Sequence, residues 1–195
     1  MKRSIKQVVP IIVLMDANIE LFYLINNGLS NPYLDFAMPP LSDIGGLTFY
    51  AVVLAVLLIM SWKDVFGLGK YWGLVRLCCA SLILTVAITA GAKLLFSQPR
   101  PSLVLEHVHV LTSSVDPNSF PSGHTATTLS TMTVLFLNAK KYFSRYNLIR
   151  CLCVIYCVLI PFSRIYIGMH YPFDVLVGGV IGMACGVVVC RYLEV

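Results

Sequence analysis

Long apolar runs alternate with short polar links along most of this chain. Four runs without a charged residue lie at 44–62, 77–92, 125–139 and 175–190, and a shorter one at 151–163 extends back to residue 147. A helix needs about 20 mostly apolar residues to cross the hydrocarbon core of a bilayer. The pattern therefore predicts five membrane-spanning helices, some reaching full length only by including a polar residue at one end.

The first 43 residues do not show so clear a pattern. Basic residues precede the apolar stretch 8–15, as in a signal peptide, but no small-residue cleavage site follows. Acidic residues then favour an amphipathic helix over about 16–26 that lies in the membrane interface, with a sixth crossing as the alternative. An Asn-Pro pair at 31–32 predicts a turn, and a Pro-Pro pair at 39–40 predicts a break before the first span.

Composition supports a membrane protein. Hydrophobic residues make up 58% of the chain and charged residues 12%, with a mean hydropathy of +0.83, whereas soluble globular proteins carry about 25% charged residues. This composition excludes a disordered chain, a coiled coil and a secreted disulfide scaffold. We expect an all-α integral membrane bundle of five or six helices, in which 1–195 is one domain with an N-terminal segment at 1–43 and the bundle at 44–191.

Neither the net charge of +5 nor the seven cysteines changes this picture. The basic residues lie singly or in small clusters beside apolar runs and form no long stripe, so no nucleic-acid partner is expected. The cysteines lie in or beside apolar runs, without two matched CxxC pairs. We interpret them as small buried hydrophobic residues rather than as a metal or redox site.

Lysine and arginine residues are distributed unequally between the two predicted sides of the membrane. If five spans alternate, the links at 62–76 and 140–150 share a side with the C-terminus, and this side holds eight basic residues against three in the opposite connections. Basic loops remain in the cytoplasm. The opposite connections are therefore expected to face the extracytoplasmic side of the cell membrane.

The predicted outward side collects a distinctive group of polar residues. Ionisable residues at span ends are costly, so a functional role is the default hypothesis for them. Three cations, two histidines and one carboxylate at one level indicate an anion site. The group consists of Lys93, Arg100, Ser122, Gly123, His124, Arg164, His170 and Asp174.

These residue types suit phosphate in particular. Arginine offers a planar fork that matches phosphate oxygens, and lysine offers a point charge. Lys93 and Arg100 are seven residues apart and would share one face of a continuing helix. Ser122 is expected to cap the next apolar helix, and the free N–H groups there, with Gly123 allowing close approach, can hold an anion.

Taken in order, these residues resemble the three-part signature of the type 2 phosphatidic acid phosphatase superfamily, which also includes bacterial undecaprenyl pyrophosphate phosphatases and vanadium haloperoxidases. The resemblance rests on Lys93-x6-Arg100-Pro101, Pro121-Ser122-Gly123-His124 and Ser163-Arg164-x5-His170-x3-Asp174.

The resemblance implies a role for each residue. His170 would attack phosphorus to form a phosphohistidine, oriented by Asp174, and His124 would protonate the leaving oxygen. Lys93, Arg100 and Arg164 would hold the phosphate oxygens together with Ser122 and Gly123. No metal or other cofactor is expected, because one carboxylate among several cations is the reverse of a magnesium site.

The resemblance further implies dephosphorylation of a membrane lipid phosphate or pyrophosphate by a catalytic bundle at 44–191. The nearest resemblance is to undecaprenyl pyrophosphate phosphatases, while phosphatidylglycerophosphate, phosphatidate and lipid A phosphatases share the signature. A vanadium haloperoxidase would be soluble and larger. A non-catalytic scaffold or lipid transporter would not need both His124 and His170.

Three further patterns have simpler explanations. Glu106-His107-Val108-His109 alternates like a metal site but is expected to be a surface segment. The hydroxyl-rich stretch at 125–133 is expected to bond to helix backbone. The glycines at 178, 182 and 186 predict close packing within the bundle, with a homodimer contact as the alternative.

Overall fold

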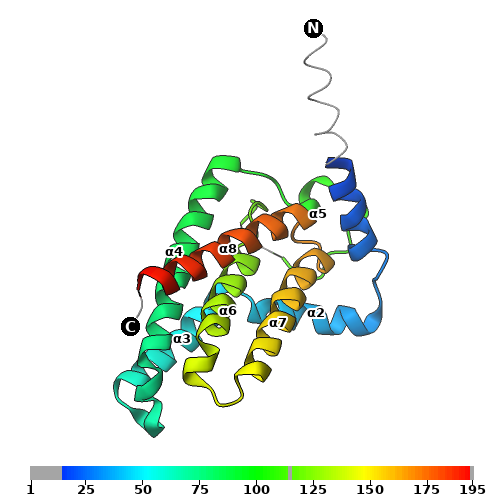
Figure 1. Ribbon diagram of the computed structural model, residues 1–195. Helices are drawn as coiled ribbons and strands as arrows, with labels where there is room; N and C mark the ends of the chain where they lie inside the picture. Colours follow the sequence, from blue (N-terminus) through cyan, green and yellow to red (C-terminus); the bar gives the residue numbers. More distant parts are fainter. Residues whose placement is uncertain (1–14, 114–115, 194–195) are drawn as a thin grey trace.

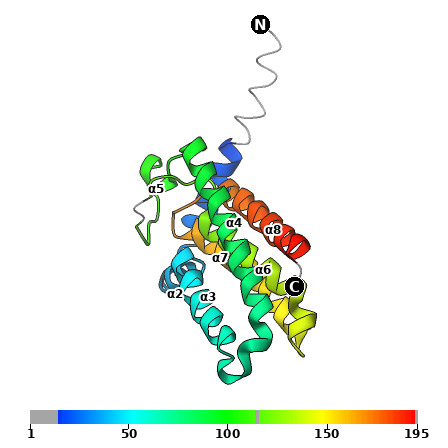
Figure 2. The same ribbon diagram turned by 90° about the vertical axis from the view of Figure 1, so that its left-hand side faces the viewer.

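A computed structural model describes residues 15–113 and 116–193 (Figures 1 and 2). Within these residues the chain is helical apart from its links, and the only β pairing is an isolated bridge between Pro99 and Asn118. The predicted all-α class is confirmed. The apolar stretch at 8–15 lies outside the described residues except for Met15. After a helix at 15–26 come α2 (Pro32–Ile44), α3 (Leu47–Trp62), the 3₁₀ helix η1 (Val65–Tyr71), α4 (Trp72–Phe96), α5 (Pro101–Val104), α6 (Gly123–Tyr142), α7 (Tyr146–Tyr166) and α8 (Pro172–Tyr192).

Helix α6 lies at the centre of the bundle and packs against α8, α7, α4 and α3. Figures 1 and 2 show the long helices running obliquely past one another, with α8 crossing α6. Within the described ranges, three helical stretches are long and apolar enough to cross a membrane: Val65–Phe96, Tyr146–Tyr166 and Pro172–Tyr192. A fourth is added if α2 and α3, bent by 50°, form one span. The predicted count of five or six crossings stays a prediction.

The prediction of a break at the Pro-Pro pair is wrong. Pro39 and Pro40 lie inside α2, and the chain bends afterwards, at Gly45 and Gly46. Each proline removes one helical hydrogen bond but does not end the helix. The bend occurs where backbone comes close to other helices. A Cβ at Gly45 would overlap the side chain of Ile160 in α7, and one at Gly46 would lie 3.1 Å from Nε2 of His124 in α6.

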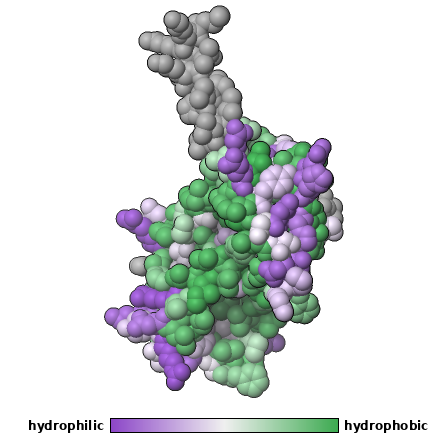
Figure 3. Space-filling model, turned by 90° about the vertical axis from the view of Figure 1, so that its right-hand side faces the viewer, coloured by the Kyte–Doolittle hydropathy of each residue, from purple (hydrophilic) through white to green (hydrophobic). Residues whose placement is uncertain are grey.

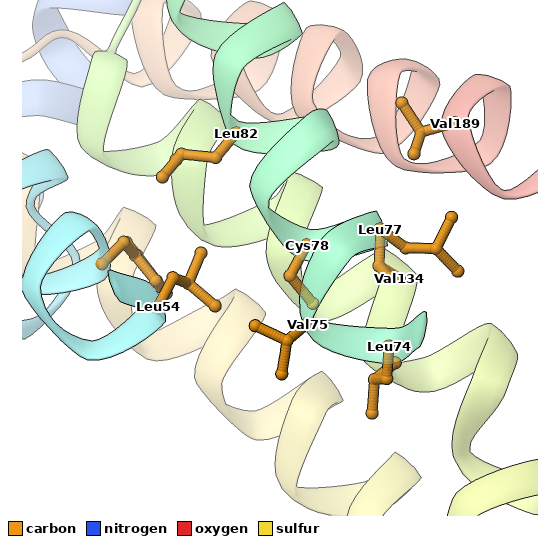
Figure 4. Packing of buried hydrophobic residues seen from close by; sticks show 9 residues of the cluster. Leu54, Leu74, Val75, Leu77, Cys78, Leu82, Val134 and Val189 are labelled. Atoms are coloured by element: carbon orange, nitrogen blue, oxygen red, sulfur yellow. The ribbon is translucent and has the colours of Figure 1, made fainter. Parts of the chain in front are cut away.

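Apolar side chains fill the interior and also cover the outside of the bundle. Figure 4 shows an interior cluster that extends across four helices, from Leu54 of α3 through Leu82 of α4 and Val134 of α6 to Val189 of α8. Three of the seven cysteines, Cys78, Cys153 and Cys185, are buried. Many large apolar side chains on the same helices point outward, and the face in Figure 3 is largely hydrophobic, with hydrophilic side chains toward its margins. Such an exterior fits a multi-pass membrane protein.

The small-residue stripe of α8 packs against the backbone of α6, as predicted. A Cβ at Gly178 would lie 2.6 Å from the Ser122 carbonyl oxygen, and one at Gly186 would lie 2.8 Å from the Ser130 carbonyl oxygen. At Gly182 a Cβ would overlap the backbone of α6 in the same way. The glycines therefore let two helices approach more closely than any side chain would allow, and they fix the position of α8 relative to α6.

Candidate active site

The predicted site residues come together at one end of the bundle, where α4 and α7 finish and α6 and α8 begin (Figure 1). The backbone N–H of Ser122, before α6, donates to the carbonyl of Asp174 in the first turn of α8 at 3.0 Å. Nη1 of Arg100 lies 3.2 Å from Nε2 of His170. These two contacts join all three parts of the signature, which are called its three blocks in chain order.

Lys93 and Arg100 converge, but not along a continuing helix as predicted. Helix α4 ends at Phe96, and Ser97 adopts a left-handed conformation with φ +43° that turns the chain. Beyond this turn, Nε of Arg100 donates to the backbone carbonyl of Asp116 at 2.7 Å. Nζ of Lys93 donates to the Asp116 carboxylate at 2.5 Å. Both cations therefore meet at a residue of the link between α5 and α6, named the outer link after the side of the membrane that the sequence predicts for it.

The start of α6 has the capped, open geometry that an anion-binding helix end requires. The Ser122 hydroxyl caps the helix by accepting from the N–H of Thr125 at 3.4 Å, and Ser122 is completely buried. No atom lies within 4 Å of the place where a Cβ of Gly123 would stand, so the first turn has open space beside it. A phosphate group can approach the free N–H groups and the positive end of the helix dipole at this point.

His124 lies in this first turn against the bend between α2 and α3. A Cβ at Gly46 would lie 3.1 Å from Nε2 of His124. The glycine therefore leaves room for the imidazole ring. The bend therefore lies next to the site rather than at the prolines.

Arg164 occupies the last turn of α7 and is only 4% exposed. Its Nη1 donates to the Ser42 hydroxyl at 2.6 Å. Its Nε has no hydrogen-bond partner among the described residues, although it is buried. A buried guanidinium with an unused donor is costly unless an anion is bound there. Arg164 is therefore suited to hold an oxygen of a ligand.

His170 and Asp174 form a buried pair at the start of α8. Nδ1 of His170 lies 3.6 Å from Oδ2 of Asp174, which accepts from the N–H of Tyr171 at 2.9 Å. Because Arg100 can only donate, its approach to Nε2 means that this nitrogen is the acceptor and that Nδ1 carries the proton. The Nδ1 proton then faces Asp174, and the Nε2 lone pair faces the cations.

Burial lowers the pKa of His170 well below its usual value, and the charges of Arg164, Arg100 and Lys93 lower it further. The imidazole is accordingly neutral at physiological pH. A neutral ring whose free nitrogen contacts Arg100, with Arg164 and Lys93 close enough to act on its pKa, can attack an anionic electrophile that these cations hold.

The segment Glu106–His109 lies in the link between α5 and α6, with Glu106 and His107 exposed as predicted for a surface segment, and the N-terminal helices anchor it there. Nε2 of His109 lies 3.0 Å from the carboxylate of Asp35, which also accepts from the Tyr166 hydroxyl at 2.6 Å. The amide of the buried Asn26 donates to the carbonyls of His109 and Tyr166 at 2.8 and 2.7 Å. Across residues 15–113 and 116–193, no group of three or more His, Cys, Asp or Glu side chains is arranged to hold a metal ion.

The hydroxyl-rich face of α6 bonds to backbone only in part. Thr127 donates to the carbonyl of Gly45 at 3.1 Å, as predicted for backbone contacts. Other hydroxyls bond to side chains instead. Tyr50 donates to Thr128 at 3.3 Å, and Ser130 donates to Ser81 at 3.0 Å. These contacts hold α6 between α3 and α4.

Sequence reasoning missed three residues that contact the site. Asp116 pairs with Lys93, Ser42 bonds to Arg164, and Gly46 accommodates His124. Asp116 offered one signal, since it is a carboxylate in the outer link close before the second block. Ser42 and Gly46 offered none, because their distance in sequence from Arg164 and His124 hides the contact.

Comparisons with known proteins agree with this geometry. The sequence profile of the PAP2 superfamily matches residues 74–194. Undecaprenyl-diphosphatase BcrC of Bacillus subtilis is 33% identical over 183 residues, covering 91% of this chain and 84% of that protein. An undecaprenyl-diphosphatase of Sulfolobus acidocaldarius is 28% identical over 166 residues, covering 85% and 73%.

A solved structure is similar over nearly the same extent. The crystal structure of Aquifex aeolicus LpxE superimposes with a TM-score of 0.73 at 32% identity, covering 90% of this chain and 96% of that one. The family profile covers more than half of the chain and includes every residue of the three blocks. The chain therefore belongs to the PAP2 superfamily, as one of its membrane lipid phosphatases.

Proposed function

We propose that this protein removes the terminal phosphate of undecaprenyl pyrophosphate through a phosphohistidine formed on His170, without a metal ion. The observation that carries the proposal is the orientation of the neutral His170 ring. Its neutral ring turns Nε2 toward Arg100 and has Nδ1 facing the Asp174 carboxylate. Three cations outnumber the two carboxylates of the site, Asp174 and Asp116, which suits phosphate rather than a divalent cation.

The proposed reaction has two steps. Nε2 of His170 attacks the terminal phosphorus, and the bond from phosphorus to the bridging oxygen breaks while His124 donates a proton to that oxygen. Undecaprenyl phosphate leaves. Water then attacks the phosphohistidine as His124 accepts one of its protons, which releases inorganic phosphate and restores the neutral His170. Lys93, Arg100 and Arg164, with the first N–H groups of α6, neutralise the charge on the oxygens.

A large apolar cavity, which opens at the surface as a groove, is consistent with a lipid substrate. A cavity of about 760 Å³ lies between α3, α4, α6 and α7 and is lined almost wholly by apolar side chains. It begins at Ile44, beside the glycine bend that contacts His124, and reaches Tyr71 and Phe143 near the opposite ends of the helices. An isoprenoid or acyl chain lying in this groove would place its phosphate at the cations.

The choice of undecaprenyl pyrophosphate is supported by the two relatives named undecaprenyl-diphosphatase. We further propose that five helices, α6 among them, cross the cell membrane and that the site faces the extracytoplasmic side. The basic links after α3 and α6 lie at the helix ends opposite to the site. Basic links remain in the cytoplasm.

Phosphate release by the purified protein in detergent tests the proposal. Undecaprenyl pyrophosphate, phosphatidylglycerophosphate, phosphatidate and a lipid A phosphate are compared, each with EDTA present. We expect the highest kcat/KM for the pyrophosphate, and acid-labile, base-stable phosphate on the protein after quenching. A preference for a glycerolipid or for lipid A would overturn the proposed substrate, and strong inhibition by EDTA would overturn the metal-independent mechanism.

A matched pair of variants tests the nucleophile. His170→Asn should abolish turnover and labelling. His107→Asn changes an exposed histidine of the outer link, at φ +54°, to a residue that tolerates this conformation, and should leave both unchanged. Turnover by His170→Asn near that of the wild type would exclude His170 as the nucleophile.

A further inference from the structure

The proposed reaction does not use Asp116, yet this residue contacts two of the three phosphate-binding cations. Its Oδ2 accepts from Nζ of Lys93 at 2.5 Å and lies 3.8 Å from Nη2 of Arg100. Its backbone carbonyl accepts from Nε of Arg100 at 2.7 Å. A carboxylate therefore stands at the donors that a phosphate group needs.

The fold holds Asp116 there through several backbone contacts. The segment after it pairs with the segment before α5: Pro99 and Asn118 form an antiparallel bridge, and the N–H of Arg100 donates to the Pro117 carbonyl at 3.2 Å. The N–H of Asn118 also donates to Oδ1 of Asp116 at 2.9 Å. One carboxylate oxygen is thus tied to its own turn, and the other is directed at the cations.

Exposure increases from Arg100 outward to Asp116. The side chain of Arg100 is 6% exposed, that of Lys93 19% and that of Asp116 44%. The carboxylate therefore stands on the solvent side of the cations, where an arriving anion would meet it. Partial burial raises the pKa of Asp116, but the hydrogen bonds from Lys93 and the N–H of Asn118, together with the charges of Lys93 and Arg100, outweigh this effect and hold the pKa below its usual value. Asp116 remains ionised at physiological pH.

Carboxylate and phosphate oxygens use the same ammonium and guanidinium donors. A phosphate group that binds to Lys93 must therefore replace the Asp116 carboxylate or accept repulsion from it. Either cost is the same for a lipid phosphate and for free inorganic phosphate. Only the lipid has a chain that gains free energy by contact with the apolar groove, so only the lipid can offset the cost.

We propose that Asp116 is a resident counter-anion of the phosphate site, which occupies Lys93 in the empty enzyme and weakens the binding of every phosphate, so that only a phosphate with a lipid chain is held well. This inference rests on the proposed function, because it takes Lys93 and Arg100 as the phosphate-binding cations. Its consequence is weak retention of the product: inorganic phosphate leaves readily because Asp116 returns to Lys93.

The opposite hypothesis is that Asp116 only orients Lys93 toward the substrate. The two hypotheses predict changes of opposite sign. If Asp116 competes with phosphate, removing its charge strengthens phosphate binding. If Asp116 only orients Lys93, removing its charge releases the ammonium group and weakens binding.

Asp116→Asn in the full-length protein distinguishes them, because asparagine keeps an oxygen to accept from the N–H of Asn118. The inhibition constant of inorganic phosphate is measured against turnover of the lipid substrate, together with the KM of p-nitrophenyl phosphate, which has no lipid chain. We expect both to fall about 2- to 5-fold, the effect of losing a partly exposed ion pair, and the KM of the lipid to fall by a similar factor, because displacing Asp116 costs the same for it. Asp116→Glu, which keeps the charge, should stay close to the wild type.

Glu106→Gln is the matched control, since it removes an exposed carboxylate of the same outer link and should leave the inhibition constant unchanged. An inhibition constant that is unchanged or higher in Asp116→Asn would overturn the role of Asp116, as would an equal fall in Glu106→Gln. If the wild type itself does not hydrolyse the lipid substrate, the proposed function is overturned, and this result is distinct from those for Asp116.

Discussion

The glycine stripe of α8 allows a prediction in which two variants share a steric cause but differ in their distance from the site. A Cβ at Gly178 would lie 2.6 Å from the carbonyl oxygen of Ser122, and one at Gly186 would lie 2.8 Å from that of Ser130. Ordinary contact at such a position begins at 3.4 Å. Because backbone atoms cannot rotate away as a side chain can, α8 must move from α6 by roughly 0.5–1 Å in either variant, which forfeits part of the packing energy between them.

We expect Gly178→Ala and Gly186→Ala to lose similar amounts of stability. Overpacking of this kind costs about 1–3 kcal/mol of the free energy of unfolding, which corresponds to a fall in Tm of roughly 2–12 °C for a chain of this size. Gly91→Ala is the control, since a Cβ there has nothing within 4 Å, and its Tm should not fall. A thiol-reactive dye can follow unfolding in detergent because three cysteines are buried.

Activity should separate the two variants. Gly178 contacts the backbone of Ser122, whose N–H donates to Asp174 beside His170. A displacement approaching 1 Å at this point should lower kcat about 10- to 100-fold, because catalysis depends on the alignment of the reacting groups. Gly186→Ala, two helical turns further from the site, should keep kcat within about 3-fold at temperatures below its Tm. Equal losses of kcat in both variants, or a wild-type Tm in both, would refute the reasoning.

Three further outcomes are expected. His124→Ala should slow turnover by about 100- to 10,000-fold and affect a poor alkoxide leaving group more than nitrophenolate; equal losses for both leaving groups would exclude His124 as the acid. Asn26→Ala removes three hydrogen bonds that tie the N-terminal helix to His109 and Tyr166. The free energy of unfolding should therefore fall by about 1–3 kcal/mol, seen as a lower Tm. A Tm equal to that of the wild type would contradict this. Because the pKa of folded His170 is lowered, only the unfolded state protonates this imidazole as the pH falls below about 6.5. Tm should therefore fall more steeply between about pH 7 and pH 5 in the wild type than in His170→Asn. Equal slopes of Tm against pH would count against a neutral buried ring.

The sequence by itself determined the helical membrane architecture and most of the candidate site. Apolar runs identify the long helices because the bilayer requires about 20 apolar residues in succession, a property of each segment alone. Alternation of spans then places Lys93, Arg164 and His170 at one level without any knowledge of packing. Capping is equally local, so Ser122 before α6 was predicted correctly.

Tertiary structure decided how those residues are held. The continuing helix expected between Lys93 and Arg100 is replaced by a left-handed turn at Ser97, which brings Arg100 to the carbonyl of Asp116. The bend at Gly45 and Gly46, rather than at the prolines, depends on contacts with α6 and α7. Neither outcome is encoded in local hydropathy.

The physical reason is the range over which each interaction acts. Burial in a bilayer and helix capping depend on neighbouring residues, so a pattern of spacing is sufficient to predict them. The pairing of Asp116 with Lys93, and that of Ser42 with Arg164, joins residues 23 and 122 positions apart. Such contacts exist only because α4, α6, α7 and the outer link pack in one particular arrangement, and close approach of backbones at the glycines of α8 fixes that arrangement.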